Sequence, residues 1–364
     1  MKKERFERLY NLLQSVKGKN IFLYGAGRRG KAAISNLELC SLTDQVLGFI
    51  DDSGNASTYC GKAVYSVSQI TDEDKRECAF IITTYAINNM SRRLMESGIP
   101  AQNVYFFAEL LIDDVDSGIF AQNSEDIHRV YDLLQDDLSR YIYKSIFEIY
   151  ETGNVEILSR TQGSCQYFPV KGTNDCIESF VLTKKEIFID CGAYTGDTIE
   201  IFKDHTKDVF KKIYAFEPEK NNCRIMESKY ADDDRIRIYP YGNWSSDEVL
   251  RFREGKGTTS EIAEDGNCEI EVRKLDSVIA LNEEVTFIKM DIEGSEQAAL
   301  IGGQRMIQEY KPKLAICIYH KLEDLWEIPL LIHKLCPEYK LYIRNYTDRL
   351  DETVCYAVYD KAGG

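Results

Sequence analysis

Two stretches of the chain combine a short apolar run, a glycine-containing loop and a helical segment. Residues 20–24 (NIFLY) are followed by 25–30 (GAGRRG), and residues 186–190 (EIFID) are followed by 191–196 (CGAYTG). Glycines in such loops let the backbone turn sharply and approach a ligand, because a Cβ atom would collide with it. The glycines expected at a ligand are Gly25, Gly27 and Gly30 in the first loop, and Gly192 and Gly196 in the second.

A carboxylate ends the apolar run that follows each loop. Asp51 and Glu217 lie 21 residues beyond Gly30 and Gly196, respectively. A separation of about 20 residues is typical of a strand-end carboxylate that accepts hydrogen bonds from ribose hydroxyls. The sequence therefore predicts two candidate nucleotide sites in two α/β domains.

The second loop differs from a dinucleotide-binding loop in its charge. Asp190 and Asp197 flank it, and its glycines are spaced more widely than in G-x-G-x-x-G. Acids at this position repel a pyrophosphate, which a dinucleotide site holds at a helix N-terminus. They suit the amino and sulfonium cations of S-adenosylmethionine (SAM), so the charge favours this methyl donor over NAD.

Two later apolar runs also end in polar residues. Asp291 and Glu293 follow VTFIKM, and His320 follows PKLAICIY. Ligands bind at the carboxyl ends of parallel strands, so these side chains should converge with Asp190 and Glu217 on one rim. His320 is a candidate general base, and Asp291 and Glu293 are candidate Mg²⁺ ligands. Both acids equally fit caps of the next helix, and His320 equally fits a structural or substrate-positioning role.

The second half of the chain resembles the FkbM family of methyltransferases. The resemblance covers about residues 186–360 and runs through FIDCGAYTGDT, YAFEPE, RKLDSVI, FIKMDIEGSEQAALIGG and KPKLAICIYHK. It implies a class I methyltransferase sheet of seven strands, the last inserted antiparallel, with SAM as donor. It also implies O-methylation of sugars or polyketide-like natural products.

The acidic loop, the rim and this resemblance together give a set of candidate donor-binding residues. They are Asp190, Gly192, Tyr194, Gly196, Asp197, Glu217, Asn243, Trp244 and Asp291. Within this set, the resemblance places Asn243 and Trp244 on the adenine side. Tyr194, Asn243 and Asn345 stand where relatives often carry Asn, Leu and His.

The region between the two α/β domains has a helical pattern. Apolar residues recur at three- and four-residue spacing between 127 and 149. We expect a Rossmann-like domain at 1–112, a helical connector at 113–185 and the methyltransferase domain at 186–364. The connector is interpreted as a helical element packed on one sheet, with a substrate-covering lid as the alternative.

The first domain resembles the nucleotide-sugar-binding N-terminal domains of bacterial sugar acyltransferases, through GFIDDSG and GKAVYSVSQI. The resemblance implies a nucleotide sugar at Gly25, Gly27, Gly30 and Asp51. Arg28 and Arg29 would then lie near phosphate, although they equally fit the exposed first turn of a helix. An NAD-binding redox domain and an interaction module without a ligand are the alternatives.

Composition excludes several function classes. The net charge of −15 over 364 residues disfavours broad binding to nucleic acid or to anionic membranes. The 11 cysteines include no C-x-x-C pair, which indicates reduced thiols and not a disulfide framework or zinc site. No apolar run reaches the length of about 20 residues that a membrane span needs, and the first residues read as an amphipathic helix. We therefore expect a cytoplasmic protein without a membrane span.

The combined prediction is a SAM-dependent methyltransferase that acts on a hydroxyl of a sugar or glycan precursor. The acceptor would belong to a surface polysaccharide, a glycolipid or a natural product. The alternatives are a non-catalytic nucleotide-sugar-binding protein and an NAD-dependent sugar oxidoreductase that acts through the first domain. Neither alternative needs the acidic loop at Asp190 or the DIEGSE segment.

Overall fold

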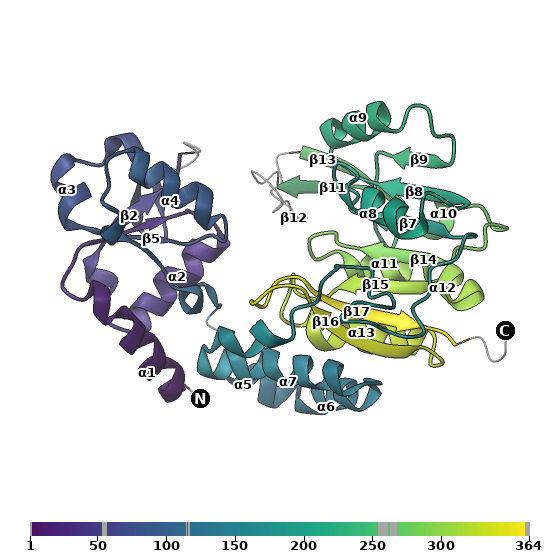
Figure 1. Cartoon of the computed structure of the whole chain (residues 1–364), viewed down its shortest axis with the longest axis horizontal. Coiled ribbons are helices and arrows are strands. Elements are labelled where there is room, and N and C mark those ends of the chain that lie inside the picture. The colour runs from purple at the N-terminus through teal and green to yellow at the C-terminus, as the bar shows by residue number, and fades with distance from the viewer. Residues whose placement is uncertain are drawn as a thin grey trace. The chain divides into compact units, whose positions relative to one another are not determined.

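A computed structural model of the chain describes residues 2–52, 57–113, 115, 117–253, 261–262 and 268–360. The chain forms two compact units, Met1–Gln122 with Ser145–Ile157 and Asn123–Lys144 with Leu158–Gly364. Each unit is built on a mainly parallel sheet flanked by helices (Figure 1). The predicted α/β class is confirmed.

The first unit contains a six-stranded sheet in the order β3-β4-β2-β1-β5-β6. All neighbouring strands pair in parallel except β3, which is antiparallel to β4. The strands are β1 (Ile21–Tyr24), β2 (Val46–Ile50), β3 (Thr58–Tyr59), β4 (Lys62–Tyr65), β5 (Ala79–Ile82) and β6 (Val104–Phe106). The central strands β1 and β5 are buried along their whole length, as expected where helices cover both faces of a parallel sheet.

The helices of the first unit connect these strands. They are α1 (Lys2–Leu12), α2 (Arg28–Leu39), α3 (Asp72–Glu77), α4 (Ile87–Glu96) and α5 (Ser117–Gln122). The periodic region identified in the sequence folds into α6 (Ser124–Leu133) and α7 (Asp137–Thr152). Helix α7 contributes residues to both units, because the division falls between residues 144 and 145.

The second unit contains a seven-stranded sheet in the order β16-β17-β15-β14-β7-β8-β9. The strands are β7 (Ile187–Cys191), β8 (Lys212–Phe216), β9 (Ile236–Tyr239), β14 (Phe287–Met290), β15 (Lys313–Cys317), β16 (Lys340–Asn345) and β17 (Thr353–Val358). Strand β17 pairs antiparallel with both β15 and β16, and the remaining pairs are parallel. The predicted seven-stranded sheet with an antiparallel last strand is confirmed.

The helices of the second unit follow the strands that carry candidate site residues. Besides α6 they are α8 (Asp197–Thr206), α9 (Lys220–Lys229), α10 (Leu275–Val278), α11 (Glu296–Gly302), α12 (Gln304–Tyr310) and α13 (Asp324–Leu335). Stacked rings help to hold the sheet to α8, because the Phe188 ring lies 4.7 Å from both Phe202 and Phe287. The stacking lies near the starts of β7 and β14, and the candidate residues lie at the opposite ends of these strands.

A small second sheet, in the order β10-β13-β11-β12, lies between β9 and β14 in the sequence. Its strands are β10 (Gly242–Asn243), β11 (Glu248–Arg253), β12 (Glu261–Ile262) and β13 (Cys268–Arg273). Leu250 of β11 pairs directly with Ile270 of β13. The pair lies on one face of the sheet, because side chains alternate between faces along a strand.

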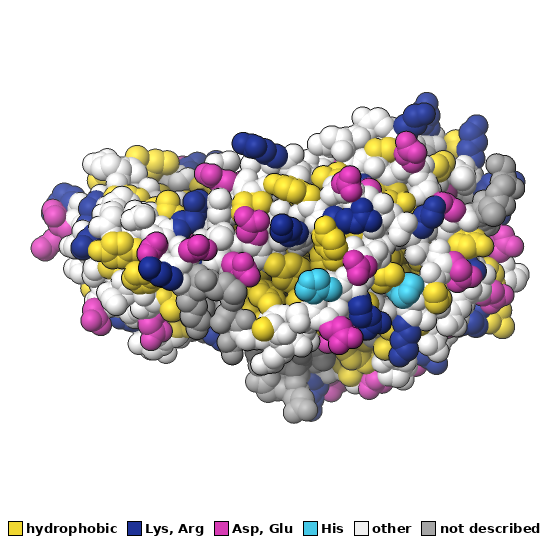
Figure 2. Space-filling view, turned by 90° about the horizontal axis from the view of Figure 1, so that it is seen from below, with side chains coloured by type: hydrophobic (Ala, Val, Ile, Leu, Met, Phe, Trp, Pro, Cys, Tyr) yellow, Lys and Arg dark blue, Asp and Glu magenta, His cyan; other side chains and the backbone are white. Residues whose placement is uncertain are grey.

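The described surface carries charges of both signs. On the face shown in Figure 2, basic and acidic side chains are interspersed with hydrophobic ones. Among the described residues, no helix is long and apolar enough to cross a membrane.

Candidate active site

A buried ion pair between Asp190 and Lys289 lies next to the loop that follows β7. Asp190 lies 3.0 Å from the Lys289 ammonium, and both side chains are buried. The ammonium also donates a 2.8 Å hydrogen bond to the carbonyl of Gly192. Burial raises the pKa of Asp190 to about 6, against the opposing pull of Lys289. Lys289 therefore links the Asp190 carboxylate to the backbone of the loop.

The two glycines of this loop have different neighbours. Gly192 has φ +76°, and a Cβ atom there would lie 1.9 Å from the Asp291 carbonyl oxygen. Gly196, with φ +81°, would meet the Tyr230 hydroxyl at 2.5 Å. That hydroxyl donates a hydrogen bond to the Gly196 carbonyl. Gly192 thus allows the β7 and β14 loops to touch, whereas Gly196 makes room for a neighbouring side chain of the protein.

Glu217, directly after β8, binds the backbone of the β7 loop. Its carboxylate accepts hydrogen bonds from the backbone amides of Tyr194 at 2.8 Å and Glu219 at 2.9 Å. Burial raises the pKa of Glu217, and these two amide bonds oppose the increase. The Glu217 carboxylate is therefore oriented by the loop at the end of the strand.

A pocket of about 190 Å³ opens above these loops. Six of the predicted site residues line it: Gly192, Tyr194, Glu217, Asn243, Asp291 and Glu293. The small sheet contributes apolar residues to its wall, namely Leu250, Ile270 and Val272. Asp190, Gly196, Asp197, Trp244 and His320 are not among the lining residues, so their predicted roles at the donor stay predictions.

Asn243 is a buried polar residue of this pocket whose side chain has no hydrogen-bond partner among the described residues. Its side chain is 3% exposed, and neither its amide nitrogen nor its amide oxygen has a hydrogen-bond partner among the described residues. Leaving such a group unpaired costs about 1–3 kcal/mol. An amide that both donates and accepts, and that faces a pocket, therefore indicates a ligand with complementary polar atoms.

Asp291, directly after β14, is bound by tyrosines on both carboxylate oxygens. Tyr167 donates at 2.7 Å to one oxygen, and Tyr319 donates at 3.1 Å to the other. Burial alone would raise the pKa of Asp291, but the His320 contact and the Lys289 charge outweigh it and lower this pKa. Asp291 is therefore a fixed carboxylate at the end of the pocket.

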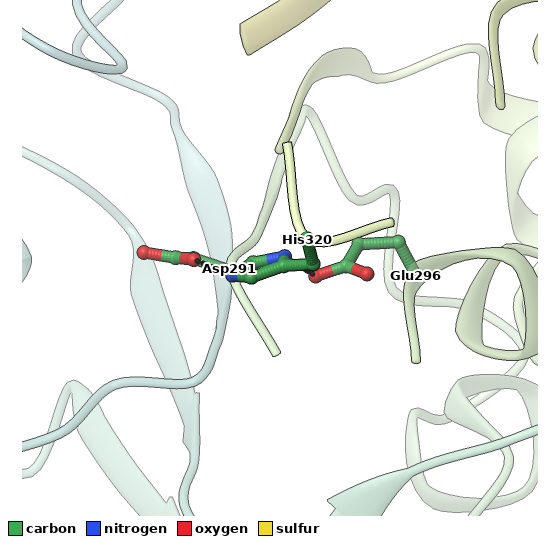
Figure 3. Close-up of side chains that lie close together, drawn as sticks. All are labelled: Asp291, Glu296 and His320. Carbon is green, nitrogen blue, oxygen red and sulfur yellow. Dashed lines mark ion pairs between the residues drawn. The ribbon is translucent and has the colours of Figure 1, made fainter. Parts of the chain in front are cut away.

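His320 lies between acids, as Figure 3 shows for Asp291 and Glu296. Its Nε2 is 3.3 Å from Asp291, and its Nδ1 is 3.0 Å from Glu296. Burial would lower the pKa of His320, but the charges and hydrogen bonds of Glu296 and Asp291 raise it well above its usual value. An imidazolium held in this way lacks a free lone pair, so the geometry favours the substrate-positioning or structural role over that of general base.

Glu293 differs from the neighbouring acids because it faces the pocket. Its nearest charged contact is His320 Nε2 at 3.7 Å, and its side chain is 38% exposed. Its backbone has φ +56°, a strained conformation for a residue with a side chain. Burial, together with the charges of Asp291 and Glu296, raises its pKa to about 7, while His320 opposes the increase. This carboxyl group can both bind a cation and take up a proton near neutral pH.

The predicted magnesium site does not fit the positions of its two acids. Both oxygens of Asp291 already accept hydrogen bonds from tyrosines, and Glu293 points toward the same histidine that contacts Asp291. Asp291, Glu296 and His320 do lie close enough to hold an ion. Mg²⁺ prefers oxygen ligands in octahedral geometry, however, and this group offers a nitrogen that is protonated.

Sequence reasoning missed several residues that organise the site. Lys289 and Glu296 lie within the recognised KMDIEGSE segment, where a buried lysine beside an acid was the available signal. Tyr167 lies in the predicted connector, and nothing in its local sequence indicates that its hydroxyl reaches Asp291. Its φ of +67° places it in the strained region, together with Tyr194, Glu293 and Glu352.

The glycine loop of the first unit packs against its own protein. A Cβ atom at Gly30 would lie 2.1 Å from the Gly25 carbonyl oxygen, whereas one at Gly27 would meet nothing within 4 Å. Asp51 accepts a hydrogen bond from the Ala26 amide at 3.3 Å. The predicted nucleotide site at these residues stays a prediction.

The two arginines of this loop contact other parts of the first unit. Arg28 forms a 3.1 Å ion pair with Asp113, and the Arg29 guanidinium lies 4.9 Å from the centre of the Tyr85 ring. Arg29 also donates to the carbonyl of Leu111. Both side chains are therefore engaged at the start of α2.

Comparisons with known proteins agree with this geometry. Residues 190–350 match the model of the methyltransferase FkbM domain. The chain is similar in fold to the crystal structure of methyltransferase FkbM from Methylobacillus flagellatus, with a TM-score of 0.62 and 22% identity. That similarity covers 98% of this chain and 99% of the other. A search of curated proteins finds no match.

Two other solved structures are similar at lower scores. A rRNA methylase from Streptococcus thermophilus has a TM-score of 0.33 and 14% identity, over 50% of this chain and 90% of that one. Fibrillarin from Aeropyrum pernix, in complex with SAM, has a TM-score of 0.33 and 13% identity, over 49% of this chain and 69% of that one.

The sheet order and the pocket at the carboxyl edge of its parallel strands are those of a methyltransferase domain. Within the second unit, residues 190–350 match the FkbM domain of methyltransferases. Neither a purely ligand-binding protein nor an NAD-dependent oxidoreductase gains support from these matches.

Proposed function

We propose that the chain uses SAM to methylate a hydroxyl group of a sugar in a surface polysaccharide, glycolipid or natural-product precursor. The observation that carries the proposal is the order of polar groups along one pocket. Asn243 follows β9, Glu217 follows β8, and Glu293 follows β14 on the far side of β7. This order suits adenine at Asn243, ribose at Glu217 and the sulfonium near Glu293.

Each group has a chemical role in this arrangement. The Asn243 amide can donate to and accept from an adenine edge, and Glu217 can accept from ribose hydroxyls. Leu250 and Ile270 offer an apolar surface for a planar base. Methyl transfer is an in-line displacement, so holding the donor rigidly between these groups contributes much of the catalysis.

Glu293 is the candidate for accepting the proton of the acceptor hydroxyl. It faces the pocket, and a carboxyl pKa of about 7 suits proton transfer at neutral pH. His320 then acts as a positioning cation between Asp291, Glu293 and Glu296, and not as the base. Acids at this end disfavour an anionic group beside the reacting hydroxyl, which supports a neutral polyhydroxylated acceptor.

Calorimetric titration with SAM, followed by transfer of a labelled methyl group to a panel of sugars and glycan precursors, tests this proposal. We expect binding in the micromolar range and a large loss of affinity in Glu217→Gln. A wild-type protein that binds no SAM, or a labelled product methylated on nitrogen or carbon, would contradict it.

A further inference from the structure

The proposed donor carries a charge that its product lacks. SAM has a cationic sulfonium, whereas S-adenosylhomocysteine (SAH), the product left after transfer, has a neutral thioether at the same atom. The two molecules otherwise share the adenosine and the amino-acid end. A negative charge close to the sulfur would therefore distinguish the two molecules electrostatically.

Most acids near the pocket are unsuited to this task. Asp190 is buried against Lys289, and both oxygens of Asp291 accept hydrogen bonds from tyrosines. Glu217 and Glu219 follow β8, at the part of the pocket assigned to ribose. Glu293 alone among the acids lining the β14 end keeps its carboxylate clear of hydrogen bonds within the described protein.

Resting on the proposed function, we propose that Glu293 makes the donor site selective for charge, so that it binds SAM more tightly than SAH. The same pocket contains the amide of Asn243, a residue that is 3% exposed and whose side chain has no partner among the described residues. That amide independently indicates an adenine-like ligand. A ligand anchored at Asn243 and Glu217 extends past β7 toward Glu293.

The charges around Glu293 explain why it would respond to a cation. Asp291 and Glu296 repel its negative charge, and Glu352 adds to this repulsion. His320 is the positive charge that contacts Glu293, and it is shared with Asp291 and Glu296. A sulfonium cation would relieve the excess of negative charge, whereas a thioether would not.

The reaction itself would remove this attraction. The bond between sulfur and the methyl carbon breaks, and a bond between the acceptor oxygen and that carbon forms. The sulfur keeps the electron pair and becomes neutral, and the hydroxyl proton passes to the Glu293 carboxylate. The ion pair between sulfonium and carboxylate is thereby replaced by two neutral groups, which favours release of SAH.

The test is a calorimetric titration of SAM and of SAH into wild-type protein, Glu293→Gln and Glu219→Gln at pH 8. We expect wild type to prefer SAM by about tenfold, as an interaction worth about 1.4 kcal/mol would give. Glu293→Gln should bind SAM about tenfold more weakly while its affinity for SAH changes little. Glu219→Gln, a matched change at the ribose part of the pocket, should keep the wild-type ratio of the two affinities even if both affinities change.

Further ligands and variants distinguish an effect of charge, on the ligand or at residue 293, from an effect of side-chain shape. Sinefungin carries an ammonium in place of the methylsulfonium and is therefore also a cation. It should bind the wild-type protein about as tightly as SAM does, which tests the role of charge without a substitution. Glu293→Asp retains the carboxylate and should retain the preference. Equal affinities of wild type for SAM and SAH, or equal losses of both in Glu293→Gln, would overturn the inference. Failure of wild type to bind either ligand would instead overturn the proposed function.

Discussion

The two units carry the same local motif, but among the described residues the motif of the second unit is the one that lines a pocket with an unpaired polar side chain. In both units a glycine loop follows a buried strand, and a carboxylate after the next strand accepts a hydrogen bond from a loop amide. In the first unit this carboxylate is Asp51, and in the second it is Glu217. The local motif alone therefore does not identify a binding site.

The difference lies in what surrounds each loop. In the second unit, the pocket beside the β7 loop is lined by Asn243 and by residues of β11 and β13. Residues of the β14 loop line it as well. In the first unit, Arg28 and Arg29 bind Asp113, Tyr85 and Leu111. A pocket does lie in that unit near Lys75 and Arg93, but none of the predicted glycines lines it.

The largest expected difference between the two loops comes from their glycines. Gly192→Ala places a Cβ atom 1.9 Å from the Asp291 carbonyl oxygen at φ +76°, whereas Gly27→Ala meets nothing within 4 Å. We expect Gly192→Ala to lose SAM binding and about 3 kcal/mol of unfolding free energy or more. Gly27→Ala should leave both nearly unchanged. Chemical denaturation and SAM titration measure the two effects, and equal behaviour of the variants would contradict the distinction.

The ion pairs near the two loops should differ in their contribution to stability almost as much as the glycines do. Lys289→Met leaves the buried carboxylate of Asp190 without its partner, which typically costs about 3–5 kcal/mol. Arg28→Met removes a pair whose side chains are 55% and 38% exposed, and should cost less than about 1 kcal/mol. Denaturant unfolding provides the measurement. Replacing Asp190 with Leu in the Lys289→Met background should recover most of the loss, and a double variant as unstable as the single one would argue against the pair.

Asn243→Leu should change stability and binding in opposite directions. The substitution removes a buried amide without partners, so we expect the free protein to gain about 1 kcal/mol of unfolding free energy. It also removes the proposed adenine contacts, so SAM should bind about thirtyfold more weakly, equivalent to about 2 kcal/mol. Thermal unfolding and calorimetry test the two effects separately. A loss of stability together with unchanged binding would show that the amide serves the fold and not the ligand.

The sequence predicts local elements better than it predicts contacts between distant ones. The seven-stranded sheet and the antiparallel place of β17 follow from apolar runs and from the family resemblance. The pairing of Tyr167 with Asp291 joins residues 124 positions apart, and no local pattern encodes it. The same holds for the contact of Lys289 with the Gly192 carbonyl.

Charge shows this limit most clearly. The sequence suggests that Asp190, in the acidic loop, binds a cationic ligand. In the structure this acid is buried against Lys289. Glu293, which the sequence places equally well at a metal or at a helix cap, instead lines the pocket. Which acid stays available to bind a cationic ligand depends on the partners that tertiary packing supplies. These partners become known only with the fold.

The smallest expected effect is the change of SAM affinity with pH. The pKa of Glu293 is raised to about 7, so its carboxyl group is mostly protonated at pH 6 and mostly ionised at pH 8. A cation favours the ionised form, and SAM should therefore bind more weakly as the pH falls, by at most about tenfold between pH 8 and pH 6. SAH has no sulfonium, and its affinity should stay nearly constant over this range.

Titrations of both ligands at several pH values, in wild type and in Glu293→Gln, distinguish this carboxyl from its neighbours. Against the effect of burial, His320 and Lys289 lower the pKa of Asp291, and the charges of Glu296 and Asp291 raise the pKa of His320, so both shifts favour the charged forms of these two groups. Glu352, with a pKa raised to about 7, titrates together with Glu293, and Asp190, with a pKa raised to about 6, titrates at the acid end of this range. A SAM profile that is flat in Glu293→Gln but sloped in Glu352→Gln would assign the effect to Glu293, and the reverse pattern would move it to the acid that precedes β17.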